Sequence, residues 1–284
     1  MQIRNLSIRR RVTNWIMTGS AGIAAVLVLA PLIAIFGYLI YKGVGAINWA
    51  FLTQLPKPVG EVGGCMGNGI VGSAMILGIG SLIGVPLGVG SGIYLSEFGR
   101  NKYSQIIRFT ADLLNGVPSI VMGIAVYALV VLRQAHFSAL SGGIALGIMM
   151  VPTIARTTEE MLLMVPHSVR EAAMGLGVSQ WRTTLSITLP SASAGVITGV
   201  MLAFARVAGE TAPLLFTAFG NQYWNRDPSQ PTAALPLQIY TYAISPFDDW
   251  HRQAWAGALV LIVLIVTAVT LVRVAAARGR MASA

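Results

Sequence analysis

The stretch VPHSVREAAMGLGVSQWRTTLSITLP, residues 165–190, is a polar island between two long apolar segments. Pro166 suits the opening of a helix, because the N–H that proline lacks has no intrahelical partner there. Ser168 followed three residues later by Glu171 is a capping-box pattern. Gly177 favours a helix end, since glycine readily adopts the left-handed conformation of a C-cap. The first half of the island is therefore predicted to be a short helix.

The second half of the island predicts another short helix. Ser179 can cap a helix that carries Trp181, and Pro190 opens the next apolar segment. In the first helix the apolar residues recur at helical spacing, so Arg170 and Glu171 should point away from its apolar face. The expected result is a helix–turn–helix knob, which could be a loop with two interfacial helices or a docking element for another protein.

The composition outside the island is that of an integral membrane protein. Of the 284 residues 55% are hydrophobic and 10% are charged, which is too apolar for an ordinary soluble domain. The net charge of +9 can be explained by membrane topology, so we expect no nucleic-acid partner. Cys65 is the single cysteine and no histidine cluster has ligand spacing, so neither redox chemistry nor a metal site is expected.

Six charge-poor segments are long enough to cross a bilayer, which requires about 20 residues. They are residues 17–41, 69–94, 111–132, 139–158, 191–219 and 254–274. With the N-terminus in the cytoplasm, most of the 19 lysines and arginines fall on the cytoplasmic side. This bias predicts that both termini are cytoplasmic, together with the polar island.

Two charged residues fall inside the fifth predicted span. In a continuous helix over residues 191–219, Arg206 would lie about 21 Å from the start, near the midplane. An arginine there costs about 3 kcal/mol on the gentlest scale, so it should not face lipid. Glu210 is one turn later and can reach Arg206.

Two roles are open to this pair. Arg206 and Glu210 could neutralise each other and pin two helices together. Alternatively, Arg206 could face a translocation path, because its guanidinium fork matches the oxygens of phosphate. Glu210 would then orient the fork and accept a hydrogen bond from a protonated phosphate, which a fully ionised sulfate cannot supply.

Arg156 lies near the cytoplasmic end of the fourth predicted span. It could be an anchor that snorkels to the headgroups or a residue of the path. Glu159 and Glu160 are its candidate partners. Asp112, at the inner edge of the third span, is expected to stabilise a helix start.

The island carries a spaced motif that resembles the EAA motif of bacterial ABC-importer permeases, the binding-protein-dependent transport family. Its residues here are Glu171, Ala172, Ala173, Gly177, Ile187, Leu189 and Pro190. The resemblance implies an all-α integral membrane protein with the six transmembrane helices of a type I ABC importer permease. It also implies that the island inserts into a cytoplasmic ATPase subunit and passes its movement to the membrane helices.

Three further stretches resemble the Pst-type phosphate-importer permeases, in particular the PstA type. They are NGVPSIV at 115–121, VPTIART at 151–157 and ARVAGETAPLLF at 205–216, and the likeness runs from about Leu55 to Pro246. This resemblance implies import of inorganic phosphate across the bacterial inner membrane by a non-catalytic, multi-pass subunit. It places Arg156, Arg206 and Glu210 on the substrate path.

The same resemblance implies a set of partners. They are a PstC-like sister permease, two PstB-like ATPase subunits, a PstS-like phosphate-binding protein outside the membrane, and membrane lipids. No cofactor is expected in this chain, since ATP-Mg would be bound by the ATPase subunits and the chain has no GxxxxGK[ST] phosphate loop.

The expected organisation is one membrane domain with short flanking segments. Residues 1–16 form a basic cytoplasmic N-terminus before a retained anchor. Residues 17–276 form the permease domain, with the coupling loop at 165–190 and an external loop at 220–252. Residues 277–284 form a cytoplasmic tail. The external segment could be an aromatic-rich loop or a contact surface for the binding protein.

Other functions remain open from the sequence. A permease for sulfate, phosphonate or molybdate would differ only around Arg206 and Glu210. A secondary transporter driven by an ion gradient would explain the spans but not the spaced EAA motif. A membrane scaffold for a cytoplasmic enzyme would explain the island without any transport.

Overall fold

The computed structural model describes residues 8–58, 61, 66–99 and 101–281. Cys65, residues 1–7 of the predicted N-terminal segment and residues 282–284 of the predicted tail lie outside them. The helices in chain order are α1 (Ile8–Gly43), η1 (Val44–Ala46), α2 (Trp49–Thr53), α3 (Gly67–Phe98), α4 (Lys102–Gly116), α5 (Ser119–Val126), η2 (Tyr127–Val131), α6 (Leu132–Gln134), α7 (Ala139–Leu163), α8 (His167–Gly175), α9 (Gln180–Thr183), η3 (Thr184–Thr188), α10 (Leu189–Ala208), α11 (Ala212–Thr217), α12 (Leu235–Ala243) and α13 (Asp248–Met281). Within the described part of the chain, β-structure is limited to one isolated bridge between Phe219 and Thr232.

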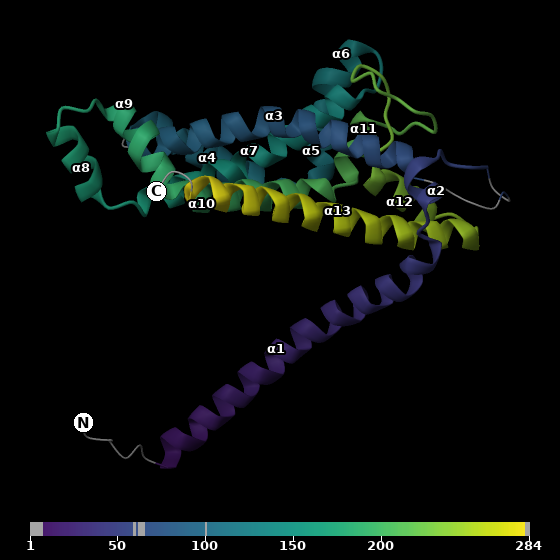
Figure 1. Cartoon of the computed structure of the whole chain (residues 1–284), viewed down its shortest axis with the longest axis horizontal. Coiled ribbons are helices and arrows are strands. Elements are labelled where there is room, and N and C mark those ends of the chain that lie inside the picture. The colour runs from purple at the N-terminus through teal and green to yellow at the C-terminus, as the bar shows by residue number, and fades with distance from the viewer. Residues whose placement is uncertain (1–7, 59–60, 62–65, 100, 282–284) are drawn as a thin grey trace.

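The all-α membrane fold is confirmed. Five helical segments are long and apolar enough to span a bilayer, and a bent pair, α4 with α5 to α6, makes up to six. Figure 1 shows most of them packed side by side, with α1 diverging from the bundle. The first residues of α1, the last residues of α13 and the pair α8 and α9 lie at the same end of the molecule.

The centre of the bundle is the contact between α3 and α7. Glycines recur every fourth residue on one face of α3, at positions 80, 84, 88 and 92. A Cβ atom added at Gly84 would lie 2.9 Å from the carbonyl oxygen of Gly147, and one added at Gly92 would lie 2.7 Å from that of Ala155. Because these glycines carry no side chain, the two backbones approach closely over several turns.

Helix α10 packs on α7 in the same way. A side chain at Gly195 would collide with Met161, and one at Gly199 would collide with Thr157. The buried side chains that fill this contact include Ile154 and Ala203. Helices α3, α7 and α10 therefore form one closely packed unit.

The third span is broken into two helical parts. It begins at Lys102 rather than near Ala111, and the chain bends by 108° between Gly116 and Ser119. Val117 is extended, with φ −72° and ψ 130°. The bend follows from Pro118, because a proline disfavours helical geometry in the preceding residue and cannot donate a backbone hydrogen bond.

The fifth span differs from the predicted continuous helix over 191–219. Its helix begins at Gln180, passes through the π-helical turn η3 and ends at Ala208, where Gly209 forms the C-cap. Helix α11 is a separate short element that opens with Pro213 in its first turn. Gly209 and Pro213 interrupt the helix, since glycine weakens a helix interior and proline removes a donor.

The segment 220–252 contains a buried helix as well as loops. Helix α12 packs against α13, and Leu235 and Tyr242 are part of a core cluster. The backbone N–H of Leu235 donates to Ser73 Oγ at 2.7 Å, and Gln238 Nε2 donates to Asn68 Oδ1 at 3.0 Å. The sixth span then begins at Asp248, earlier than the predicted residue 254.

Helix α1 touches the bundle only near its end. Of its residues, Leu39 and Gly43 are buried, and Tyr38 makes an edge-to-face contact with Trp255 at a centroid distance of 5.1 Å. Gly43 lies against the backbone oxygen of Trp255. After a basic first turn, the apolar residues of α1 before Leu39 are left exposed by the described part of the chain, so lipid or a partner subunit must cover them.

The contact between α3 and α7 yields a stability prediction. In Gly92→Ala the new methyl group meets the backbone of Ala155 and the side chain of Thr158, so we expect a loss of about 1–3 kcal/mol. The measurement is the melting temperature of the detergent-purified chain. Gly90→Ala is the matched control, because nothing lies within 4 Å of its added Cβ atom. Equal melting temperatures for the two variants would contradict the close contact.

Candidate functional site

The first half of the polar island is helix α8, as predicted, but its start differs. The helix begins at His167 with Pro166 as N-cap, and no side chain caps it. Ser168 therefore lies inside the first turn, and the predicted capping box with Glu171 is wrong. Pro166 takes the extended cap conformation itself, with φ −55° and ψ 139°. Gly177 has φ +82°, which confirms the predicted left-handed turn.

Arg170 was predicted to lie off the apolar face of this helix, and the structure shows that its side chain is nevertheless buried. Its Nη1 and Nη2 atoms donate to the backbone oxygens of Val165 and Leu162, each at 2.7 Å. Its Nε and Nη2 atoms donate to Glu97 Oε1 at 3.1 and 3.0 Å. Leu162 lies in the last turn of α7 and Val165 just beyond its end, and the charged guanidinium group donates to the carbonyl oxygen of each. Arg170 thereby joins α8 to the ends of both α3 and α7.

The other EAA residues divide between a surface and a helix. Glu171, Ala172 and Gly177 are exposed and Ala173 is buried against the protein. Ile187, Leu189 and Pro190 belong to the uninterrupted helical segment from Gln180 to Ala208. The second predicted short helix is thus the first part of the fifth span, at the end of the molecule where α8 lies. Displacement of α8 and α9 has a direct mechanical route to α10.

Apolar side chains are exposed around the tip of this knob. Leu176 is 86% exposed, Trp181 58% and Met174 45%. Large apolar side chains exposed on one short segment are typical of a docking site for another protein. The island therefore has a fixed inner side, held by Arg170, and an apolar outer side.

Arg170 provides a test of this anchoring. Arg170→Met removes the fork and leaves Glu97 buried without its partner, a change that costs about 3–5 kcal/mol for buried pairs. We expect α8 to detach, so that chymotrypsin cleaves beside Leu176 and Trp181 several-fold faster. Arg133→Met is the control, since Arg133 is exposed on α6 and lies outside the island. Equal cleavage rates in the two variants would show that Arg170 does not hold the island.

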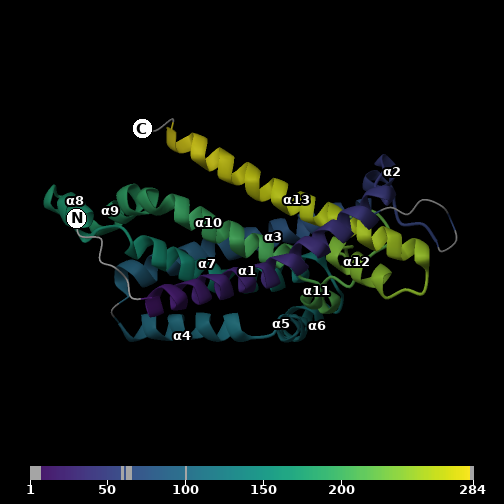
Figure 2. The same cartoon turned by 90° about the horizontal axis from the view of Figure 1, so that it is seen from below.

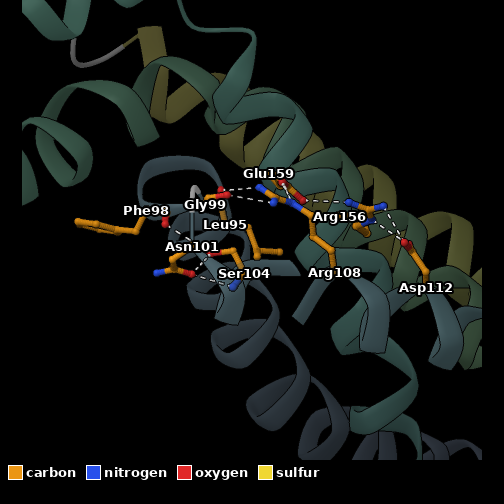
Figure 3. Close-up of polar contacts among 9 residues, drawn as sticks. All are labelled: Leu95, Phe98, Gly99, Asn101, Ser104, Arg108, Asp112, Arg156 and Glu159. Atoms are coloured by element: carbon orange, nitrogen blue, oxygen red, sulfur yellow. Dashed lines mark hydrogen bonds and ion pairs between the residues drawn. The ribbon is translucent and has the colours of Figure 1, made fainter. Parts of the chain in front are cut away.

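A cluster of four charged residues joins α4 to α7 (Figure 3). Arg156 Nε and Nη2 donate to the two carboxylate oxygens of Asp112 at 3.0 and 2.9 Å. Arg156 Nη1 donates to Glu159 Oε2 at 3.2 Å, and Arg108 Nε donates to Glu159 Oε1 at 2.7 Å. The expected partnership of Arg156 with Glu159 is confirmed.

Two expectations about this region are wrong. Glu160 is exposed and makes no ion pair among the described residues, so it does not partner Arg156. Asp112 lies in the interior of α4 rather than at a helix start. Arg108 also donates to the backbone oxygens of Leu95 and Gly99 at 3.0 and 3.1 Å, which ties the end of α3 into the cluster.

Arg206 and Glu210 do not form the expected pair. Arg206 is exposed in the last turn of α10, and Glu210 lies beyond the helix end at Ala208. The i,i+4 geometry that would bring them together requires one continuous helix. In the described part of the chain, no hydrogen bond or ion pair joins Arg206, Glu210 and Arg156 to one another.

The contacts with α7 nevertheless place both helix breaks at the same depth. Gly195 meets Met161 and Gly199 meets Thr157, so this antiparallel register brings Arg206 to the level of Met150. Asp112 meets Arg156, and Thr153 Oγ1 donates to Asn115 Oδ1 at 3.2 Å, so the break at Val117 lies near Val151. Both levels are close to the middle of α7, which runs from Ala139 to Leu163.

The two broken spans also touch. Helix α11 packs on α5 (Figure 2), and a Cβ atom at Gly123 would lie 2.6 Å from Pro213 Cα. Non-helical backbone at membrane depth is tolerated where it lines a cavity or is covered by protein, and many transporters bind substrate at such breaks. The candidate path therefore runs past the two breaks, with Arg206 and Glu210 at one and Asn115 at the other.

Sequence reasoning missed several of these residues. Asn115, Asp112 and Arg108 were not recognised as partners of α7. Two signals were available: the spacing of Arg108 and Asp112, one helical turn apart, and the dipeptide Val117-Pro118 in the middle of an apolar segment.

A cavity of about 800 Å³ opens at the end of the molecule opposite α8. Its lining combines aromatic and polar side chains from the segments before α3 and around α12. The residues that line it include Lys57, Phe219, Asn221, Tyr223, Gln238, Thr241, Tyr242 and Trp250. Many of these residues belong to the segment 220–252, which was predicted to be either an aromatic-rich loop or a contact surface for a binding protein.

Comparison with known proteins identifies the class. Residues 84–280 match the family described as "Binding-protein-dependent transport system inner membrane component", and the chain belongs to that family. The fold is shared with a solved chain of the MetNI methionine ABC transporter, with a TM-score of 0.57, 19% identity and coverage of 77% of this chain and 97% of that one. An amino acid ABC transporter gives a TM-score of 0.53 at 18% identity, with coverage of 74% and 92%.

Within this class the chain is a PstA-type permease. It is 44% identical to the phosphate transport system permease protein PstA of Haemophilus influenzae over 90% of this chain and 91% of that protein. It is 34% identical to PstA 1 of Mycobacterium tuberculosis strain CDC 1551 / Oshkosh, over 98% of this chain and 94% of that one. The chain is therefore a multi-pass inner-membrane transport subunit, as expected, rather than an enzyme.

Proposed function

We propose that this chain is the PstA-type permease subunit of an ATP-driven importer of inorganic phosphate. Its relatives are named as phosphate transport permeases, and the observation that carries the proposal is the pair of helix breaks at the middle of α7. Arg206 lies at the depth of these breaks, and its guanidinium group makes no described ion pair with Glu210. An exposed arginine at the bilayer midplane is tolerable only where water, substrate or a partner subunit meets it.

The substrate path is completed by a second permease. The face of α10 that carries Arg206 also exposes Leu202, which is 62% exposed, so the described helices leave this face uncovered. A PstC-like sister permease would cover this face and α1, with lipid around the remainder. The phosphate ion would pass between the two permeases, attracted by Arg206 and hydrogen-bonded through its own proton to Glu210.

The coupling loop, residues 165–190, would insert into an ATPase subunit. An ABC permease works with an ATPase and a substrate-binding component, and PstB-like and PstS-like subunits are the particular partners we propose. ATP-Mg would be bound by the two ATPase subunits, whose closure would move the apolar knob of α8 and α9. Because the segment from Gln180 to Ala208 is one helix, this motion reaches Arg206 and opens the path alternately to each side.

This function requires that α8 be cytoplasmic, together with the start of α1 and the end of α13. In a Cys65→Ser background, Ser168→Cys on α8 should react with a membrane-impermeant maleimide only after the cells are permeabilised. Ser229→Cys, which is exposed in the segment 220–252, should react in intact cells. The opposite pattern of labelling would show that α8 lies outside the cytoplasm, where it could not contact the ATPase subunits.

Arg206→Gln tests the path itself. In vesicles that carry the assembled complex and binding protein, we expect ATP-dependent phosphate uptake to fall at least tenfold, because about 1.4 kcal/mol of lost anion stabilisation is tenfold. ATPase subunit content and assembly must equal those of the wild type. The parallel variant Glu210→Gln should retain uptake but narrow the preference for phosphate over sulfate.

The other functions give different results. Uptake that persists after ATP depletion would indicate a secondary transporter. Normal phosphate uptake in Arg206→Gln would remove this residue from the path. If the wild-type complex takes up sulfate instead of phosphate, the chain is a permease of a sulfate importer.

A further inference from the structure

The fork of Arg156 is already occupied by a carboxylate. Asp112 accepts two parallel hydrogen bonds from Nε and Nη2, which is the geometry in which a guanidinium group binds two oxygens of a phosphate. The carboxylate of Asp112 thus stands where two oxygens of a tetrahedral oxyanion would stand. An anion can reach this fork only by displacing Asp112.

The two acidic partners of Arg156 are held very differently. The side chain of Glu159 is 5% exposed and shared between Arg156 and Arg108. The side chain of Asp112 is 54% exposed, and its described polar contacts are those with Arg156. Glu159 is therefore a fixed member of the cluster, whereas Asp112 is the group that can leave.

Charge and position favour the exchange. Arg108 and Arg156 balance Glu159 and Asp112, so release of Asp112 leaves an unbalanced positive charge that an oxyanion can neutralise. In the register of α7 and α10, Arg206 is level with Met150, which is six residues before Arg156 on α7. At 1.5 Å per residue, Arg156 therefore lies about 9 Å farther along the axis, toward the end of α7 that leads to α8. The fork of Arg156 is thus the next cationic position along the axis after Arg206.

Helix α4 can carry Asp112 away. Of its residues only Ser104 and Ala111 are buried, and the break at Val117 and Pro118 separates it from α5. Its polar links to α7 are those of Arg108, Asp112 and Asn115. A small displacement of α4 would open the fork without disturbing the glycine contact between α3 and α7.

We propose that Asp112 is an intramolecular competitor for the oxyanion at Arg156, a positioning residue that closes this subsite when it is empty and hastens release when it is filled. This inference rests on the proposed function, since it assumes that an oxyanion travels past α7. Binding in a transport path must be weak enough for exit, and a tethered carboxylate achieves this by replacing the departing anion.

Direct anion binding tests the proposal. The complex of this chain with its sister permease and ATPase subunits, without the binding protein, is placed in nanodiscs of phosphatidylcholine and titrated with radiolabelled phosphate and sulfate. Asp112→Asn should bind the anion about fivefold more tightly, because it removes one half-exposed charge partner of Arg156. In sealed vesicles with the binding protein, the maximal rate of uptake by Asp112→Asn should fall, since release becomes slower. Asp112→Glu, which keeps the carboxylate, should behave like the wild type.

Two controls separate competition from a structural role. The gain in affinity must vanish in the double variant Asp112→Asn with Arg156→Gln, because the fork is then absent. Glu160→Gln removes an exposed carboxylate from α7 without changing the pair and should leave anion affinity unchanged. Unchanged or weaker binding of both anions by a correctly assembled Asp112→Asn complex would overturn the proposal.

The remaining outcomes distinguish the possible ligands. If Asp112→Asn binds sulfate more tightly and the wild type takes up no phosphate, Asp112 competes with an oxyanion as proposed, but the proposed function as a phosphate importer is wrong. If phosphatidylglycerol in the nanodisc removes the gain, the fork binds a lipid headgroup, and the proposal is overturned for a transported anion. Absence of binding by every form of the complex would overturn it as well.

Discussion

The close approach of α3 and α7 is the contact on which the rest of the structure depends. Because glycines at every fourth position of α3 remove the side chains from this contact, the two backbones form a rigid pair. Helix α10 adds to this pair through Gly195 and Gly199. Helix α4 is attached by polar contacts, and α8 by the guanidinium group of Arg170. Each functional element is thus positioned by its own link to α7.

The kind of link differs with the element and suits its role. Apolar contacts between small residues are dense and have no alternative partners, so they suit parts that must stay together. Ion pairs such as Arg156 with Asp112 can exchange one anionic partner for another at little cost. In the proposed transport cycle the elements joined by ion pairs, α4 and α8, would shift relative to their neighbours, whereas α3, α7 and α10 would move together as one packed unit.

The two helix breaks connect the fold to the transported ion. In a bilayer an unsatisfied backbone group costs several kcal/mol, so an interruption near the middle of a span persists only where protein or water satisfies it. Here α5 and α11 cover one another at the breaks, while Arg206 stays exposed on α10. In the proposed complex a second permease faces this surface and completes the path beside Arg206.

The sequence alone determined the class of the protein, because span length, charge bias and the spaced EAA residues are local properties. It also anticipated the partnership of Arg156 with Glu159, three residues apart on one helix. The tertiary structure decided the contacts between distant segments. Arg170 was placed off the apolar face of its helix, and only the structure shows that it is buried against Glu97. Glu210 was expected to reach Arg206 but lies past a helix end. Asp112 was assigned to a helix start and occupies the fork of Arg156. These outcomes depend on how Gly209 and Pro118 interrupt the helices and on which side chains then meet across the bundle, and residue spacing along one chain carries no information about contacts of that kind.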